Sequence, residues 1–403
     1  MEKWVGRVCQ KFVERPGILP FANVLCAVPA YWFAAETGEH QAPSKQAHPG
    51  HSEAYLSLVC FVMASKPVAE GGLEPAVAAP MTLLADVLGE GLAAVKVRGY
   101  AILEMSPACF SAMNRLRASQ SHFFGLPREE KKKYAQCHAV NTHGISEVSD
   151  LKYYFQARSG GKGAGLPFPG RYDFSSDFGV DILDVYTQLD LLGRACLLEL
   201  APSLGVPLCR IVDILDPLGA KRVAMETLTK EQILALDFPS VREEGEGTTV
   251  YSELLPDGYV SSSNLDLFFY HNNETTRSKW ALNHPTHTDS GIISFIPVSA
   301  VPALDFFDQK LNAWIEIERA VHEQAGALGK TYQQFVIAMA GDTLEQLAKN
   351  TFKAGLHRVV RTQETRESAV YKLRARPELV GPKYEVDYKI VQIQRKALGL
   401  PDL

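Results

Sequence analysis

The strongest constraint on how this chain can fold is a pair of short segments in its C-terminal half that carry histidine and aspartate. The first, HPTHTDSG, spans residues 284–291, and the second, AGLHRVV, spans residues 354–360. Residues two apart on a β-strand point to the same face of the sheet. His287 and Asp289 are therefore predicted to present an imidazole and a carboxylate together, and His357 is predicted to join them from another strand.

Two histidines and one carboxylate on one side of a metal ion form a facial triad, the arrangement that non-haem Fe(II) oxygenases use. It leaves coordination positions open for a bidentate co-substrate and O2. The pattern thus predicts an iron site made by His287, Asp289 and His357. An H-x-D pattern by itself is a weak signal, and His284 offers an alternative H-x-x-H pairing. We expect His284 to point off the shared face and to form a local turn hydrogen bond.

The rest of the pattern predicts helices first and many short strands afterwards. Helical spacing covers residues 82–94, 106–124 and 181–200, and residues 94–103 alternate like a strand. After about residue 215, the best strand candidates are residues 265–270, 291–297, 303–307, 314–318, 335–340 and 368–374. This order favours a mainly β fold with helical support (α+β), in which N-terminal helices pack on a double-stranded β-helix, or jelly roll.

The chain divides into three predicted regions. Residues 1–75 form an N-terminal extension, residues 76–215 a helical N-terminal region, and residues 216–403 the jelly-roll catalytic domain with a C-terminal helix. Within the extension, the apolar stretch 18–35 follows several basic residues and contains two prolines. It is interpreted either as a targeting segment or as a partly buried extension. The polar stretch 36–52, rich in Pro, Gly and His, is predicted to be a linker.

Composition excludes several classes of protein. A net charge of −5 and an isoelectric point near 6.1 give no reason to expect nucleic acid or an acidic membrane as a partner. The seven cysteines form no C-x-x-C pair, which argues against a disulfide scaffold or a thiolate zinc site and fits free buried thiols in a reducing, cytoplasmic compartment. No apolar run reaches the roughly 18–20 residues of a membrane helix, so stable membrane insertion is not expected. The basic run 131–133 is predicted to be a solvated helix face.

Further motifs accompany the histidine segments in a fixed order. They are VKVRGYAIL (95–103), FFGLPREEKKKY (123–134), DLKYYFQAR (150–158), GDTLEQLAKNTFKAGLHRVV (341–360) and RES (366–368). In this order they resemble the isopenicillin N synthase-like family of 2-oxoglutarate/Fe(II)-dependent dioxygenases, over about residues 80–390. The resemblance implies that the H-x-D pair and the distal histidine bind iron.

The resemblance also implies a co-substrate site. Arg366 and Ser368 match the R-x-S pair that binds the distal carboxylate of 2-oxoglutarate, and a guanidinium suits a carboxylate because it donates two parallel charge-assisted hydrogen bonds. Tyr270 stands where the family often has a tyrosine that reaches the same carboxylate. Phe268 replaces the family's usual asparagine, so Tyr270 is also interpreted as a core residue.

Two stretches are longer than the family pattern predicts. Residues 321–334 are expected to be an inserted loop between the H-x-D pair and the distal histidine, and residues 238–262 to be a second insertion before the first barrel strand. Loops of this size beside a site often form a lid or a substrate wall, and surface insertions are the other interpretation.

The function implied by the resemblance is an oxidoreductase that requires Fe(II), 2-oxoglutarate and O2. It would oxidise a small organic metabolite by hydroxylation, desaturation or cyclisation, with release of succinate and CO2, and act as a monomer. Two alternatives stay open. One is a non-haem iron oxidase of the same fold that needs no 2-oxoglutarate, and the other is a non-catalytic binding protein that retains the fold.

Overall fold

The structure is a computed structural model, and it describes residues 75–134, 144–148, 151–158, 177–204, 215, 261–274, 282–349 and 351–375. Chain contacts divide the protein into residues 1–60 and 61–403, and every described residue belongs to the second unit. Four predicted features therefore lie outside the described residues, namely the stretch 18–35, the linker 36–52, nearly all of the insertion 238–262, and the C-terminal helix.

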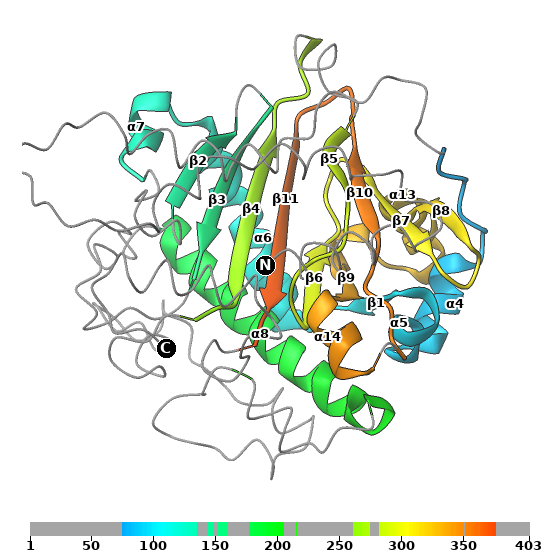
Figure 1. The fold of residues 1–403 in the computed structure, drawn as a ribbon. Helices are drawn as coiled ribbons and strands as arrows, with labels where there is room; N and C mark the ends of the chain where they lie inside the picture. Colours follow the sequence, from blue (N-terminus) through cyan, green and yellow to red (C-terminus); the bar gives the residue numbers. More distant parts are fainter. Residues whose placement is uncertain are drawn as a thin grey trace, which may run out of the picture. The chain divides into compact units, whose positions relative to one another are not determined.

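The described strands form two antiparallel sheets (Figure 1). The large sheet has the order β1-β9-β6-β11-β4-β3-β2, and the small sheet has the order β5-β10-β7-β8. The strands are β1 Tyr100–Glu104, β2 Gly144–Val148, β3 Lys152–Ala157, β4 Asn264–Tyr270, β5 Leu282–His287, β6 Ile293–Pro297, β7 Leu304–Asp308, β8 Ala313–Glu316, β9 Phe335–Ala340, β10 His357–Val360 and β11 Arg366–Leu373. The predicted jelly-roll core is confirmed.

Helices cover one face of the large sheet. The described helices are α4 Leu83–Glu90, α5 Ala93–Arg98, α6 Pro107–Gly125, α7 Arg128–Lys132, α8 Asp177–Leu204, α13 Ile317–Gln324 and α14 Asp342–Leu347. Helix α8 runs along β3, β4 and β11 in Figure 1, and its Tyr186 packs edge-on against Tyr371 of β11. Gly193 allows the close approach, because a Cβ there would lie 3.0 Å from Leu373 and 3.1 Å from Phe295. The predicted helical support is confirmed by α6 and α8.

The prediction of a strand over residues 94–103 is wrong for its first half. Residues 93–98 form helix α5, and β1 starts only at Tyr100. Gly99, at φ +89°, separates the two because it adopts the left-handed conformation that ends a helix. Within α5, Ala94, Val95 and Arg98 are buried, which is the spacing of one helix face rather than of a strand.

Two further predictions need correction around α13. The strand predicted at 314–318 ends at Glu316, so Glu318 lies in the first turn of the helix. The segment 321–334, predicted as an inserted loop, is mostly helical: it continues α13 and adds the 3-10 turns Ala325–Leu328 and Tyr332–Gln334. Buried Val321 and Ala325 anchor this segment to the core.

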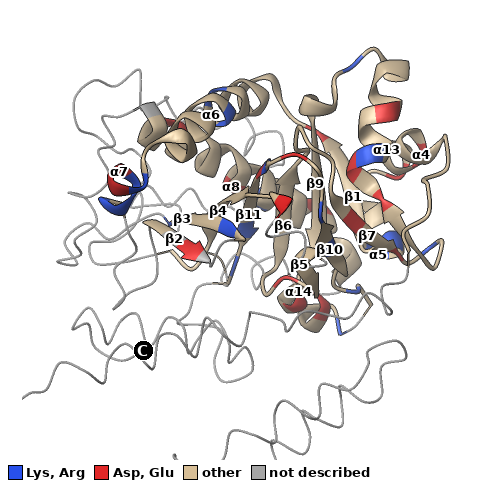
Figure 2. Ribbon diagram, turned by 90° about the horizontal axis from the view of Figure 1, so that it is seen from above, with Lys and Arg blue, Asp and Glu red and all other residues tan. Residues whose placement is uncertain are grey.

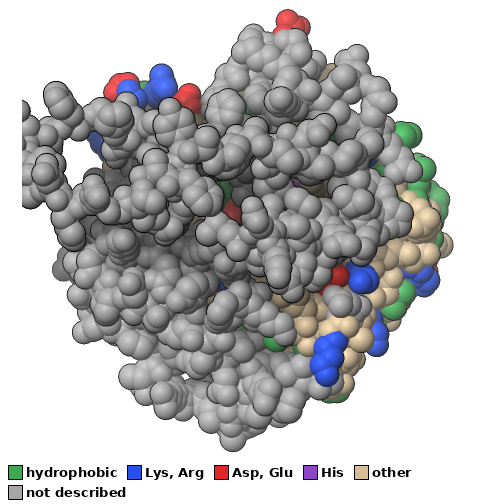
Figure 3. All heavy atoms as spheres, in the orientation of Figure 1, with side chains coloured by type: hydrophobic (Ala, Val, Ile, Leu, Met, Phe, Trp, Pro, Cys, Tyr) green, Lys and Arg blue, Asp and Glu red, His purple; other side chains and the backbone are tan. Residues whose placement is uncertain are grey.

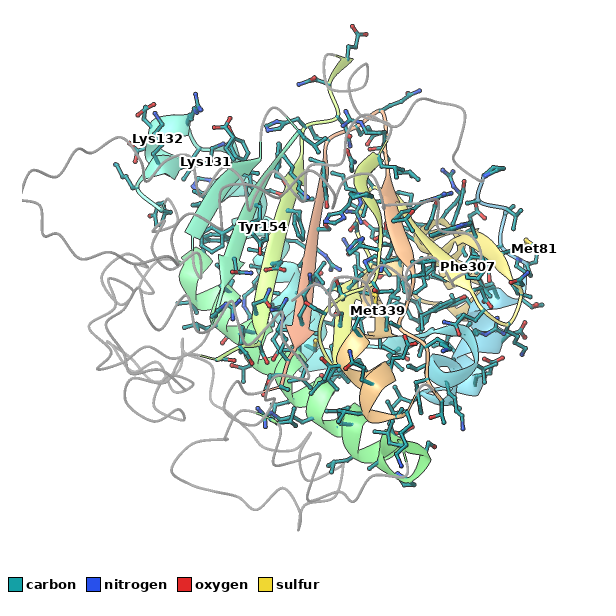
Figure 4. The ribbon with its side chains drawn as sticks, viewed as in Figure 1. Met81, Lys131, Lys132, Tyr154, Phe307 and Met339 are labelled. Atoms are coloured by element: carbon teal, nitrogen blue, oxygen red, sulfur yellow. The ribbon has the colours of Figure 1, made fainter. Side chains whose placement is uncertain are left out.

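The basic run 131–133 is only partly solvated. Helix α7, which carries acidic and basic residues, lies near β2 (Figure 2), and Lys132 at its end and Lys133 just after it are exposed. Lys131 is buried instead: its ammonium donates to the carbonyl of Phe124 at 2.7 Å and lies 4.2 Å from the centre of the Tyr153 ring. Figure 4 labels Lys131 and Lys132 on this helix.

The predicted regions 76–215 and 216–403 share the large sheet, because β1, β2 and β3 of the first region pair with strands of the second.

Two of the seven cysteines are described, and Cys109 and Cys196 are both free and buried. Among the described residues, no helix has the length and apolarity to cross a bilayer. On the face shown in Figure 3, some basic side chains of described residues lie beside acidic ones and others lie among uncharged ones.

A tight backbone contact joins the turn between β9 and α14 to the loop that carries Asp289. The amide of Asp342 donates to the carbonyl of Asp289 at 2.8 Å. A Cβ on Gly341 would lie 2.3 Å from the carbonyl oxygen of Gly291, and backbone atoms cannot move aside as a flexible side chain can. Glycine is therefore required at position 341 for the Asp289 loop to dock.

We expect Gly341→Ala to lower the free energy of unfolding by about 2 kcal/mol or more, because the added methyl group forces the two backbones apart. The same shift should weaken metal binding, since it displaces Asp289. Urea unfolding and metal titration test both effects. Gly89→Ala in α4 is the control, because nothing lies within 4 Å of its added Cβ. Equal effects of the two substitutions would contradict the argument.

Candidate functional site

The structure brings the three predicted metal ligands together at one end of the small sheet. His287 is the last residue of β5, and Asp289 lies two residues further on. His357 is the first residue of β10 and is paired directly with His287 in the antiparallel register. The ligand atoms of the three side chains all lie within 4.8 Å of one another, which is compact enough for one metal ion.

Backbone carbonyls select the tautomers of both histidines. Nδ1 of His287 lies 2.8 Å from the carbonyl oxygen of Pro285, and Nδ1 of His357 lies 3.0 Å from that of Gly355. A carbonyl oxygen only accepts hydrogen bonds, so each Nδ1 must carry the proton. The lone pair of each Nε2 is then available to a metal, as in protein sites where a second partner orients the histidine.

Asp289 is buried, and its two carboxylate oxygens differ. Oδ1 lies 3.1 Å from the ammonium of Lys372, whereas Oδ2 has no hydrogen-bond partner among the described residues. Burial opposes ionisation, but the ammonium of Lys372 holds the pKa of Asp289 below its usual range. A buried, ionised oxygen without a partner is rare in a folded protein. The donor set therefore fits a divalent cation.

Burial also keeps the histidines neutral, which is the form that binds metal. It lowers the pKa of His287 to about 3, with a further contribution from His357. Burial likewise lowers the pKa of His357.

His284 lies beside this group but does not belong to the cluster of potential ligands among the described residues. Its Nδ1 lies 3.3 Å from the carbonyl oxygen of Pro285, a local contact like the one predicted. The ring stacks on that of His287, with 4.1 Å between centroids, so His284 is not turned away from the site as expected. Burial holds its pKa well below the usual value.

The residues predicted for the co-substrate lie on the large sheet. Arg366, at the start of β11, is paired with Tyr270 at the end of β4. Ser368 is paired with Phe268, two residues further along each strand, so all four side chains point to the same face of the sheet. The Arg366 guanidinium lies 5.7 Å from the centre of the Tyr270 ring. All three predicted residues are buried, so Tyr270 is both a core residue and a neighbour of Arg366.

The sequence did not reveal the partner of Arg366. Its Nη2 donates to both carboxylate oxygens of Glu318, at 3.0 and 3.1 Å, and its Nε donates to the carbonyl of Val301 at 3.1 Å. Burial alone would raise the pKa of Glu318, but Arg366 and backbone amides lower it, so the pair is ionic. The amides that donate to Glu318 belong to Ser299, Ala303 and Leu304.

Donors remain for an anionic co-substrate in spite of Glu318. Within the described part of the chain, no group accepts a hydrogen bond from Nη1 of Arg366 or from the hydroxyl of Tyr270. Burial raises the pKa of Tyr270 well above its usual value, so the phenol keeps its proton and can donate. The residues present therefore fit the distal carboxylate of 2-oxoglutarate, although two of the three guanidinium nitrogens of Arg366 already donate to Glu318 and Val301.

The sequence argument missed two lysines on the same face of the large sheet. Lys372 lies an even number of residues after Arg366 and Ser368 on β11, so its side chain points to the same face of the large sheet. Its ammonium reaches Asp289, in the loop after β5 of the small sheet. Lys152 of β3 is paired with Tyr270. Side chains of a strand point alternately to its two faces. Applied to the motif DLKYYFQAR, and to the strand that continues for a few residues after the motif RES, this alternation would have placed both lysines in the site.

No family model and no curated protein matches the sequence. Among solved structures, a candidate oxygenase from Shewanella oneidensis is 16% identical, with a TM-score of 0.48 and coverage of 79% of this chain and 96% of that chain. A full-length Neurospora crassa protein in complex with alpha-KG is 17% identical, with a TM-score of 0.47 and coverage of 73% and 79%. The Arabidopsis thaliana dioxygenase for auxin oxidation 1, in complex with 2-oxoglutarate, is 14% identical, with a TM-score of 0.46 and coverage of 74% and 90%. The functional assignment rests on the residues of the site.

We expect the metal-free protein to lose stability as the pH falls from about 6.5 towards 3. In this window the unfolded histidines bind protons while His287, whose pKa is about 3, stays neutral in the folded protein, and the lowered pKa of His357 adds to the effect, so the free energy of unfolding falls with pH. The loss is at most about 1.4 kcal/mol per histidine for each pH unit.

Urea unfolding at pH 7.5 and pH 5.0 measures this loss. His287→Gln should reduce the loss, whereas His122→Gln, at an exposed position on α6, should leave it as in the wild type. A loss that is the same in both variants would show that the metal-site histidines do not cause it.

We expect Glu318→Ala to lower the free energy of unfolding by about 3 kcal/mol, because it leaves the Arg366 guanidinium buried without a counter-ion. Glu323→Ala, at an exposed position on the same helix, should change it by less than about 0.5 kcal/mol. Urea unfolding measures both variants. A Glu318→Ala protein as stable as the Glu323→Ala control would mean that the ion pair contributes little.

Proposed function

We propose that this chain is an Fe(II)- and 2-oxoglutarate-dependent oxygenase that oxidises a small organic molecule. The order of its motifs supports a place in the isopenicillin N synthase-like family. The observation that carries the proposal is the convergence of two neutral histidines and one ionised carboxylate, within 4.8 Å of one another, between two sheets. A site of this composition with open positions suits Fe(II).

Each residue of the site has a proposed role. His287, Asp289 and His357 hold the iron, and Lys372 stays beside the carboxylate oxygen that it already contacts. Nη1 of Arg366, with Ser368 and Tyr270, holds the distal carboxylate of 2-oxoglutarate. When bound, iron and 2-oxoglutarate supply the activation of O2 that couples substrate oxidation to release of succinate and CO2. The chain contributes orientation and a site from which water is excluded.

One observation favours a second candidate, an iron oxidase that needs no 2-oxoglutarate. Glu318 already neutralises the charge of Arg366, which reduces the attraction of this arginine for another carboxylate. An oxidase takes all its electrons from the substrate, so turnover without succinate formation would identify it.

The test is 2-oxoglutarate binding to the Fe(II)-loaded protein without oxygen, followed by optical absorption. Chelation of iron by the keto acid should produce a weak visible charge-transfer band. Ser368→Ala should require about tenfold more 2-oxoglutarate, because one hydrogen bond to a charged group is lost. Ser111→Ala, at an exposed position on α6, should behave as the wild type.

The three outcomes of this experiment separate the assignments. A band that responds to Ser368→Ala supports both metal and co-substrate. Iron binding without a band at millimolar 2-oxoglutarate would reject the co-substrate and leave the oxidase. A protein that binds no iron would show that the three residues do not form the metal site.

A further inference from the structure

Lys152 is a buried cation that the proposed chemistry does not use. It is 9% exposed, at the start of β3 and opposite Tyr270 in the antiparallel register. Its ammonium lies 5.0 Å from the centre of the Phe268 ring and 5.5 Å from that of Tyr270. Within the described residues, no group accepts a hydrogen bond from it or forms an ion pair with it. Burial of an unpaired charge is unfavourable, so such a group is retained where a ligand supplies the partner.

The two neighbouring cations of the same sheet face are already paired. Lys372 lies 3.1 Å from Asp289 and 3.5 Å from Asp266, and Arg366 is held by Glu318. Asp266 has little capacity left for Lys152, because its Oδ1 accepts hydrogen bonds at 2.5–3.0 Å. The donors are the Tyr154 hydroxyl and the side-chain amides of Gln156 and Asn264.

Lys152 lies over a row of aromatic rings. Phe268 stacks on Tyr154 with 5.1 Å between centroids, and on Tyr270 with 5.8 Å. Tyr154, labelled in Figure 4, lies on β3 beside β4. Through Asp266 and Lys372 this aromatic row is connected to Asp289 and hence to the metal site. A ligand above the row would have apolar contacts below it, a cation at one end and the metal nearby.

We propose that Lys152 binds a carboxylate of the primary substrate, a small molecule whose flat apolar part lies over Tyr154, Phe268 and Tyr270. The proposal rests on the proposed function, which places this aromatic row beside an active site. The carboxylate assigned to Lys152 is that of the substrate, because Arg366, Ser368 and Tyr270 already supply the donors proposed for the distal carboxylate of 2-oxoglutarate. Burial, and then the ammonium of Lys372, lower the pKa of Lys152 to about 7, whereas Asp266 raises it, so a bound carboxylate would favour the protonated form.

The test compares benzoate with benzamide, which has the same shape and no charge, by calorimetry on the metal-free and the Fe(II)- and 2-oxoglutarate-loaded protein without oxygen. The wild type should bind benzoate more tightly than benzamide. Lys152→Met should weaken benzoate binding by about tenfold or more and leave benzamide unchanged, because only the ion pair is lost. Lys131→Met is the matched control, because Lys131 also lies over a tyrosine ring, that of Tyr153. Tyr153 directly follows Lys152 on β3, so its side chain points to the opposite face of the sheet.

Folding and co-substrate binding are measured in the same variants. Lys152→Met should unfold at the same or a higher urea concentration than the wild type, because it removes a buried unpaired charge, and its affinity for 2-oxoglutarate should be unchanged. Equal binding of benzoate and benzamide, or no benzoate binding at millimolar concentration, would overturn the proposal. Weaker 2-oxoglutarate binding in Lys152→Met would also overturn it and assign Lys152 to the co-substrate. Failure of the wild type to bind iron or 2-oxoglutarate rejects the proposed function alone, because the metal-free titration still tests Lys152.

Discussion

The pairing of β5 with β10 is the interaction on which the site depends. It places His357 opposite His287, and the carbonyls of Pro285 and Gly355 then orient both rings through Nδ1. A shift of one residue in this register would turn every side chain of β10 to the other face. The close backbone contact at Gly341 docks the Asp289 loop against the turn after β9, so the carboxylate is held by a different part of the fold from the histidines.

Buried charges organise the space between the sheets. Lys372 reaches from the large sheet to Asp289, and Glu318 reaches from α13 to Arg366. Asp289, Arg366 and Glu318 are buried and Lys372 is half-buried, and ions taken out of water are stable only when hydrogen bonds and counter-ions replace their hydration. Glu318 meets this condition with three backbone amides besides Arg366. Lys152 does not meet it within the described residues, which distinguishes it from the other cations of the same face.

Local patterns predicted much of the architecture because long, strongly periodic segments resist tertiary influence. The helices at 106–124 and 181–200 and the strand at 335–340 belong to this class. Predictions were wrong where a short segment fits two periods. Residues 94–98 alternate like a strand, yet Gly99 ends a helix there, and residues 321–334 look like a polar insertion although α13 and two 3-10 turns occupy them.

The sequence by itself determined which residues can hold a metal, because an H-x-D pair and a distal histidine on a neighbouring strand leave few geometries open. It also placed Arg366, Ser368 and Tyr270 near one another through the order of motifs. Only the tertiary structure decided their partners. Glu318 and Lys372 come from elements far apart in the chain, and the folded structure brings Glu318 within 3.0 Å of Arg366 and Lys372 within 3.1 Å of Asp289. Sheet register places Lys152 opposite Tyr270. No local pattern encodes such contacts, since their strength depends on burial that exists only in the folded protein.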